Sequence, residues 1–380
     1  MPDRIVTTHV GSLPRPPDVS DLLFRRAAGA DVDDAVFQQT VGDAVHDVVA
    51  RQHAVGIDVP SDGEMSKIGY ATYVSERLAG FSGDSPRRVP ADLLEVPRYM
   101  ERLARQGGTP AIKRPMCTGP ISVRTTAPLE ADIARFRDAL AASGYDTGFM
   151  NAANPGVIAL FQPNAFYPSD DAYLARLAEA MATEFRAIVE ADLTLQVDAP
   201  DLALGRQTMY ADRSEDEFVR RIETHVAVLN AALAGLPRER VRVHLCWGNY
   251  EGPHTHDVPL ARILPAVLRI EAGAFSFEGA NPRHAHEWAV FRDIPLPEDR
   301  VIIPGVLDSS TNYVEHPDLV AERLCRYADV VGRERVIAGT DCGFGTFAGF
   351  GVVDPDIVWM KFAAMVAGAE KASHRLWGRA

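Results

Sequence analysis

The feature that most constrains the fold is a regular alternation of short apolar stretches, each of strand length, with longer helical patterns. The candidate strands lie at 4–9, 56–60, 111–117, 147–151, 193–198, 241–246, 273–277, 301–306 and 335–339. Helical patterns run at 170–191, 214–234, 317–330 and 355–370. Because strands that alternate with helices pair in parallel through right-handed crossovers, the sequence predicts an α/β protein. Two layouts satisfy this pattern, a (β/α)8 TIM barrel and a doubly wound open sheet.

The positions of the reactive side chains favour the barrel. In a (β/α)8 barrel the functional residues collect at the carboxyl ends of many different strands. Reactive residues follow most of the candidate strands here, namely Ser12, Asp62, Glu64, Asp198, His244, Cys246, Glu278, Asp308, Asp341 and Cys342. A Rossmann sheet would instead carry a glycine-rich turn after its first strand, and the sequence VGSLPR at 10–15 is not such a turn.

The number of candidate strands exceeds the eight places of a barrel, so we expect one insertion. We place it around 120–165. The Pro- and Arg-rich segment 83–100 predicts in addition an enlarged second βα loop. No internal linker, charge block or repeat divides the 380 residues, and we therefore expect one domain over 1–380.

Charge and cysteine usage narrow the function classes. Lys and Arg number 39 against 52 Asp and Glu, and the resulting net charge of −13 argues against binding to nucleic acid or to an anionic membrane. The amino-terminal residues do not read as a signal peptide, and no apolar run reaches the roughly 18 residues of a membrane helix. Four widely spaced cysteines fit a reducing compartment, so we expect a cytoplasmic protein.

A metal site is the most specific chemistry in the sequence. His244 and Cys246 have i, i+2 spacing, which on a strand directs both side chains to one face. Glu278 and Cys342 end two further strands, so four side chains can converge at the same end of a barrel. Zinc accepts imidazole, thiolate and carboxylate in tetrahedral geometry. Such an electron-rich site suits holding a substrate thiolate for alkylation better than activating water. A structural zinc, or cysteines packed in the core without a metal, are the alternatives.

The chain resembles a known family, the C-terminal catalytic barrel of cobalamin-independent methionine synthase. The matching segments follow one another along nearly the whole chain: GSLPR at 11–15, GIDVPSDGE at 56–64, SERLAGF at 75–81, TGPIS at 118–122, LQVDAPD at 195–201, HLC at 244–246, SFE at 276–278, PGVLD at 304–308 and TDCGFG at 340–345. The resemblance implies Zn²⁺ bound by His244, Cys246, Glu278 and Cys342. It also implies that Ser12, Glu64 and Asp198 contact the thiol substrate.

Two departures from the synthase pattern concern the alkyl donor. The synthase has a tryptophan after its TGP motif on which folate stacks, and Val123, Arg124 and Thr125 follow that motif here. It also has a histidine after the aspartate equivalent to Asp308, where this chain has Ser309. The single-barrel length and the segments HLCWGN at 244–249 and VDAPDLA at 197–203 resemble the epoxyalkane–coenzyme M transferases of the same family.

The main prediction is therefore a zinc-dependent enzyme in which a metal-held thiolate attacks the electrophilic carbon of an epoxide or alkyl donor. S-methyl transfer to homocysteine is the alternative, and a non-catalytic thiol- and zinc-binding barrel is a further one. We expect Asp198 and Asp308 to be catalytic, while His9, His316 and Tyr70 are other candidates for the proton donor. Arg15, Lys67 and Arg206 are candidate anchors for an anionic thiol. The expected partners are small molecules, and a homo-oligomer is compatible with the sequence.

Overall fold

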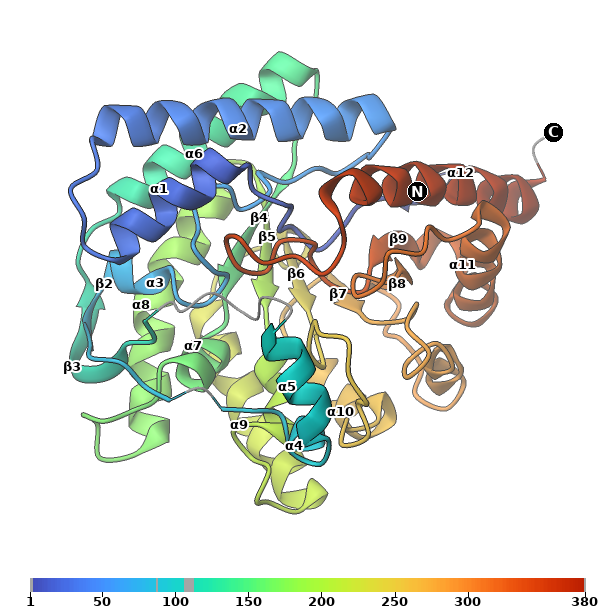
Figure 1. Ribbon diagram of the computed structural model, residues 1–380. Coiled ribbons are helices and arrows are strands. Elements are labelled where there is room, and N and C mark those ends of the chain that lie inside the picture. Colours follow the sequence, from blue (N-terminus) through green and yellow to red (C-terminus); the bar gives the residue numbers. More distant parts are fainter. Residues whose placement is uncertain (1–2, 87, 106–112, 379–380) are drawn as a thin grey trace.

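Seven parallel strands form the central sheet of the computed structural model, which describes residues 3–86, 88–105 and 113–378. They are β1 (Val6–Thr7), β4 (Phe149–Ala153), β5 (Thr194–Asp198), β6 (Val241–His244), β7 (Ala274–Phe277), β8 (Val301–Leu307) and β9 (Ile337–Thr340). Their order is β1-β9-β8-β7-β6-β5-β4, and the strands lie in the middle of the molecule with helices around them (Figure 1). An α/β fold with a curled parallel sheet is therefore confirmed.

The two edges of this sheet, β1 and β4, are bridged by residues 58–61 rather than by a regular strand. The backbone N–H groups of Asp58 and Val59 donate to the carbonyl oxygen of Thr7 at 3.2 and 3.1 Å, and Phe149 N–H donates to Pro60 O at 2.9 Å. Pro60 has no N–H to donate, and the Asp58 carboxylate accepts the N–H of Thr7 at 2.8 Å, so the usual ladder cannot form. The eight-stranded barrel that we expected is thus curled but not fully closed.

The insertion lies earlier in the chain than the sequence suggested. The candidate strand at 111–117, as far as it is described, becomes part of β3 (Met116–Val123), which pairs antiparallel with β2 (Leu78–Ser82) outside the main sheet. The candidate at 147–151 is instead β4, whose residues are all buried in the sheet. The predicted insertion around 120–165 is therefore wrong, because that range contains a strand of the curled sheet. The enlarged second loop is present, and it holds β2, β3, α3 (Val74–Arg77), α4 (Ala91–Leu94) and α5 (Pro97–Arg105).

The longer helices cover the outside of the sheet. They are α1 (Pro17–Ala27), α2 (Asp34–Val55), α6 (Ala127–Ser143), α7 (Pro155–Phe161), α8 (Asp170–Glu190), α9 (Glu215–Ala232), α10 (Leu260–Val267), α11 (Pro317–Val331) and α12 (Pro355–Trp377). Local sequence explains several helix starts. Ser169 caps α8, and Ser214 and Glu217 form the capping box that begins α9. Helix α2 packs on α1 and α6, and α11 packs on α12 (Figure 1).

A buried group of charges fixes the enlarged loop to the helices behind it. Arg77, the last residue of α3, contacts Asp132 of α6 at 2.5 Å and Glu184 of α8 at 3.0 Å. The hydroxyl of Tyr73 donates to the other oxygen of Glu184 at 2.5 Å. Because these side chains are almost fully buried, each charge depends on its partner for stabilisation.

Among the described helices, none has the length and apolar character required to cross a bilayer.

Candidate metal centre and substrate cavity

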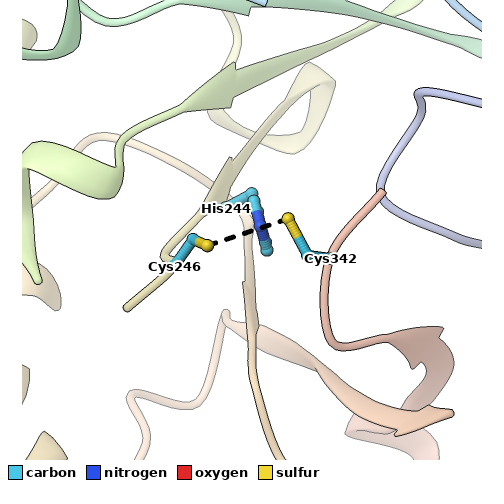
Figure 2. Close-up of side chains that lie close together, drawn as sticks. All are labelled: His244, Cys246 and Cys342. Atoms are coloured by element: carbon cyan, nitrogen blue, oxygen red, sulfur yellow. Dashed lines mark hydrogen bonds between the residues drawn. The ribbon is translucent and has the colours of Figure 1, made fainter. Parts of the chain in front are cut away.

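Three of the four predicted metal ligands meet at one point. One potential ligand atom from each of His244, Cys246 and Cys342 lies within 4.8 Å of the others, and the two sulfur atoms are 3.7 Å apart. His244 ends β6, Cys246 lies in the loop after it, and Cys342 lies in the loop after β9 (Figure 2). Strands β6 and β9 are separated in the sheet by β7 and β8. The curvature of the sheet therefore brings these ligands together.

The His244 imidazole is in a suitable state to bind a cation. Burial and the nearby Arg242 guanidinium lower the pKa of His244 to about 3, so the ring is neutral at physiological pH. Its Nδ1 lies 3.3 Å from the Ser276 hydroxyl, whereas Nε2 is buried without a hydrogen-bond partner among the described residues. A buried imidazole nitrogen without a partner is costly unless something else contacts it. The orphaned Nε2 beside two thiols fits a zinc ligand set.

Cys246 needs a nearby positive charge in order to ionise. The hydrogen bond between the two sulfur atoms, followed by burial, raises the pKa of Cys246 well above its ordinary value. The Gly248 N–H, which donates to the Cys246 sulfur at 3.3 Å, acts in the opposite direction. A divalent cation supplies the charge that turns both thiols into thiolate ligands.

Glu278, the fourth predicted ligand, lies beside this group rather than within it. Its Oε1 accepts the N–H of Trp247 at 2.7 Å, and its Oε2 accepts from the Asn281 side-chain amide at 2.6 Å. Burial and the adjacent Cys246 raise the pKa of Glu278 well above its ordinary value. The carboxylate is thus next to Cys246, yet it is not part of the group whose ligand atoms all lie within 4.8 Å.

The predicted substrate residues line the same cavity as the three ligands. This cavity has a volume of about 1180 Å³, and its walls include Ser12, Glu64 and Asp198 as well as His244, Cys246 and Cys342. All six side chains are buried. Residues spread over the whole chain therefore converge on one chamber with a candidate metal centre in its wall.

Glu64 and Asp198 form an acidic region in this chamber. Burial raises the pKa of Glu64 to about 7, and the nearby Asp198 adds to the effect of burial. Glu64 also has a positive φ of 57°, a strained conformation for a residue with a Cβ atom, and its Oε2 has no hydrogen-bond partner in the described chain. Burial raises the pKa of Asp198 to about 6, although hydrogen bonds from Asn151 and Gln196, each 2.8 Å long, lower it. Two buried carboxylates of this kind are suited to a cationic group of a ligand.

Ser12 packs directly against the loop that carries Cys342. A Cβ atom added at Gly343 would lie 2.0 Å from the Ser12 hydroxyl oxygen. In addition, the Phe344 N–H donates to the Ser12 carbonyl oxygen at 2.8 Å. Glycine at 343 is therefore required for the close approach of these two segments at the metal centre.

The structure separates the remaining candidates. Tyr70 lines the main cavity, whereas Asp308 lines a neighbouring cavity of about 150 Å³, which Glu278 and Cys342 also border. The Asp308 carboxylate accepts hydrogen bonds from Ser310 and Thr311 in its own loop. His9 is buried against Gln52, and His316 is exposed at the start of α11, so neither lines the cavity.

The predicted cationic anchors are also outside the cavity lining. Arg15 donates to the carbonyl oxygens of Glu64 and Gly345, and Lys67 donates to the Asn151 carbonyl oxygen at 2.6 Å. Arg206 likewise does not line the cavity. Among the described residues, the arginines that line it are Arg88 and Arg114, from the enlarged loop. Sequence reasoning missed both because nothing in their local pattern shows how that loop folds back over the strand ends.

A second group of histidines is hydrogen-bonded away from the ligands. His284 contacts Asp257 at 3.1 Å and Glu287 at 2.8 Å. Burial lowers the pKa of His284, but hydrogen bonds to Asp257 and Glu287 outweigh burial and raise it to about 10. His254 also pairs with Asp257, at 2.9 Å, so this group is a buried ion-pair network rather than a second metal site.

Comparisons with known proteins agree with this geometry. Residues 156–365 match the family described as cobalamin-independent synthase, catalytic domain. The chain is 25% identical over 368 residues to a methionine synthase of Sulfurisphaera tokodaii, covering 96% of this chain and 91% of that one. It is 24% identical to a methionine synthase of Saccharolobus solfataricus, over 97% of this chain and 95% of that one.

Solved structures share the fold. A B12-independent methionine synthase from Shewanella sp. W3-18-1, in complex with selenomethionine, superposes with a TM-score of 0.72 at 19% identity and covers 99% of this chain and 100% of that one. A putative vitamin-B12 independent methionine synthase from Listeria monocytogenes gives a TM-score of 0.65 at 18% identity, over 97% of this chain and 98% of that one.

Proposed function

Because the chain belongs to the cobalamin-independent methionine synthase catalytic family and is thus a methyltransferase-type enzyme, we propose that it transfers a methyl group to the thiol of homocysteine with the help of zinc. The relatives above are named methionine synthases, and they support this alternative rather than the epoxyalkane–coenzyme M reaction that we expected first. The observation that carries the proposal is the orphaned His244 Nε2 beside the Cys246 and Cys342 sulfurs, in the wall of a cavity that two buried carboxylates share.

The donor set and the cavity suit an amino-acid thiol. Homocysteine carries an ammonium group, a carboxylate and a thiol. In this proposal Glu64 and Asp198 bind the ammonium group, and Ser12 donates a hydrogen bond to the substrate. The structure of the Shewanella protein was solved in complex with selenomethionine, the selenium analogue of the methionine that this reaction would form.

His244, Cys246 and Cys342 would hold the zinc, with Glu278 next to Cys246 as the proposed fourth ligand. When bound, zinc lowers the pKa of a substrate thiol and keeps it nucleophilic as a thiolate. The residues of the chain position the substrate around this thiolate. The buried walls exclude water from the thiol, and the paired carboxylates orient the amino-acid portion so that the sulfur points toward the methyl donor.

The leaving group of the methyl donor must receive a proton. Two carboxyl groups near the metal centre are candidates to donate it. Asp198 lines the main cavity, but binding of the ammonium group would keep it ionised. Asp308 lines the smaller cavity, which Cys342 also borders, and we propose it as the proton donor. Ser310 and Thr311, which hold the Asp308 carboxylate, line both cavities and connect them.

The test measures zinc content and methionine formation together in the wild-type protein and in C342S. We expect about one zinc per wild-type chain, and in C342S a loss of zinc together with a loss of methyl transfer of about 100-fold or more. C325S is the matched control, because Cys325 lies on α11 away from the cavity, and it keeps both properties.

The assay supplies homocysteine with methyltetrahydrofolate in one arm and coenzyme M with short epoxides in the other. Full methyl transfer by metal-free protein would refute the zinc mechanism. Turnover only in the epoxide arm would refute the proposed substrate, and stoichiometric thiol binding without turnover in either arm would indicate a carrier.

A further inference from the structure

The side chain of Asn249 joins three of the loops that surround the metal centre. Asn249 lies three residues after Cys246, in the loop that follows β6. Its Nδ2 donates to the carbonyl oxygen of Gly343 and to the hydroxyl of Thr346, both at 2.8 Å. Its Oδ1 accepts from the hydroxyl of Ser309, in the loop after β8, at 2.9 Å. Both donors of the carboxamide and its oxygen are thus in use.

These hydrogen bonds connect the two cysteine-bearing loops where the sheet does not. Strands β6 and β9 are not neighbours, so no ladder hydrogen bond runs between them. Within the described residues, and apart from the contact between the two sulfur atoms, the hydrogen bonds from segment 245–250 to segment 341–346 both come from Asn249. Figure 2 shows Cys246 and Cys342 approaching each other from these separate segments.

A glycine lies close to each cysteine in these two segments. Gly248, with a φ of 130°, lies between Cys246 and Asn249, and Gly343 follows Cys342 directly. Backbone of this kind has more conformations to lose than backbone with side chains. Each loop is held separately, since the Leu204 N–H donates to the Cys246 carbonyl oxygen and the Thr340 hydroxyl to the Cys342 carbonyl oxygen, so a hydrogen bond that joins the two loops adds a restraint on the sulfur–sulfur distance. The Asn249 carboxamide is anchored next to Cys342 through the Gly343 carbonyl, and it supplies that restraint.

We propose that Asn249 is a positioning residue for the metal centre: it holds the loops of Cys246 and Cys342 so that the two sulfur atoms are pre-organised for one ion. The inference goes beyond the ligand set and rests on the proposed function only in taking that ion to be zinc. The hydrogen bonds of the Asn249 side chain within the described chain go to Gly343, Thr346 and Ser309 and to neither sulfur, so it acts through the ligand loops.

The chemistry of the side chain explains why an amide is needed. The Gly343 carbonyl requires a donor and the Ser309 hydroxyl requires an acceptor, and a primary amide offers both. An aspartate at 249 would keep the acceptor but would turn a negative charge toward the Gly343 carbonyl. An alanine would remove all three hydrogen bonds.

The first experiment measures metal binding in the full chain with Zn²⁺ and Co²⁺. We expect N249A to weaken Zn²⁺ binding by about 10-fold or more in a chelator competition, as is typical of groups that orient metal ligands. We also expect weaker thiolate-to-cobalt charge-transfer absorption, because that band requires both sulfurs at bonding distance. T346V and S309A each remove one partner of Asn249, so they test the same restraint if N249A folds poorly, and each should give a smaller loss in the same direction.

The second experiment needs no zinc. A trivalent arsenical such as phenylarsine oxide binds two thiols only when they are close together. We expect metal-free N249A to bind it several-fold more weakly than the metal-free wild type. C325S controls for reaction at a thiol away from the centre.

N230A is the matched control variant. Asn230 also bridges two segments through its side-chain amide, with Nδ2 donating to Arg269 O and Oδ1 accepting from Glu271 N, both at 2.9 Å, but it does not line the cavity. It should lower thermal stability without changing metal affinity, the cobalt spectrum or arsenical binding. If N249A, T346V and S309A match the wild type in these measurements within twofold, Asn249 does not position the cysteines. If the wild type binds the arsenical tightly but no zinc, the proposed function fails while the positioning of the thiols is still tested.

Discussion

The two buried carboxylates of the cavity should make capture of an amino-acid thiol strongly dependent on pH. Glu64, with a pKa raised to about 7 by burial, and Asp198, with a pKa raised to about 6, both need to be ionised in order to bind the substrate ammonium group. Because a raised pKa means that the carboxylate takes up a proton at higher pH than usual, acidification from pH 8 to pH 6 should weaken binding. We therefore compare the wild type with the variant E64Q between pH 8 and pH 6.

The size of the loss in substrate capture follows from the pKa values of Glu64 and Asp198. At pH 8 about 90% of the molecules have both groups ionised, and at pH 6 about 5% do, if the two titrate independently. The kcat/KM for homocysteine, which reports the ionisation of the free enzyme, should therefore fall about 20-fold between pH 8 and pH 6. In E64Q only Asp198 titrates, so kcat/KM should be lower at pH 8 and should fall only about twofold over the same interval.

The assay records initial rates of product formation at several thiol concentrations across this pH range. The matched control is 4-sulfanylbutanoate, which keeps the thiol and the carboxylate of homocysteine but has no ammonium group. The kcat/KM of this compound reports any pH dependence of the metal centre and of the thiol. The ratio of the kcat/KM for homocysteine to that for 4-sulfanylbutanoate therefore isolates the ionisation of the two carboxylates. The reasoning is refuted if this ratio is constant from pH 6 to pH 8, or if E64Q keeps the full 20-fold dependence.

Two further predictions concern stability. R77M removes the cationic partner of the buried Glu184 and leaves Asp132 paired with Arg135 alone, so the free energy of unfolding in urea should fall by about 3 kcal/mol. Removing the buried imidazolium in H284Q should cost about 3 kcal/mol near pH 6.5. Because the pKa of His284 is raised in the folded state to about 10, its contribution is complete below its unfolded value of 6.5 and is lost as the pH rises toward 10. The difference in unfolding free energy between H284Q and the wild type should therefore shrink between pH 6.5 and pH 10.

Each stability prediction has a control on the surface. Arg176 pairs with Glu179 at 2.5 Å, but both side chains are more than half exposed, so R176M should change stability by less than about 1 kcal/mol. H316Q removes an exposed histidine at the start of α11 and should change stability by less than about 1 kcal/mol. Equal effects of R77M and R176M, or an H284Q penalty that grows with pH, would contradict the argument from burial.

The parallel strands of the sheet were predictable because their signal is local. A buried parallel strand is a short apolar run, and the runs that became β4, β5, β6, β7, β8 and β9 could be located from sequence alone. Helix starts such as those of α8 and α9 depend on the capping serines Ser169 and Ser214, which are also local. The i, i+2 spacing of His244 and Cys246 belongs to the same kind of information.

Strand partners were less predictable, because pairing depends on residues distant in the chain. Apolar content did not distinguish the candidate at 111–117, which contributes to the outer hairpin, from the one at 147–151, which enters the sheet. Nor did it reveal that Pro60, together with the Asp58 carboxylate, prevents a regular strand between β1 and β4.

The sequence by itself determined which residue types stand at the carboxyl ends of the strands, and with them the kind of chemistry that the chain can perform. Only the tertiary structure decided which of these side chains meet. The curvature of the sheet brings Cys342 to His244 and Cys246, while local hydrogen bonds hold Asp308 beside the smaller cavity. The link through Asn249 arises in the same way, because its three partners lie 60 to 97 residues away in sequence. Local patterns fix where a side chain points along its own strand, and long-range packing fixes what it meets there.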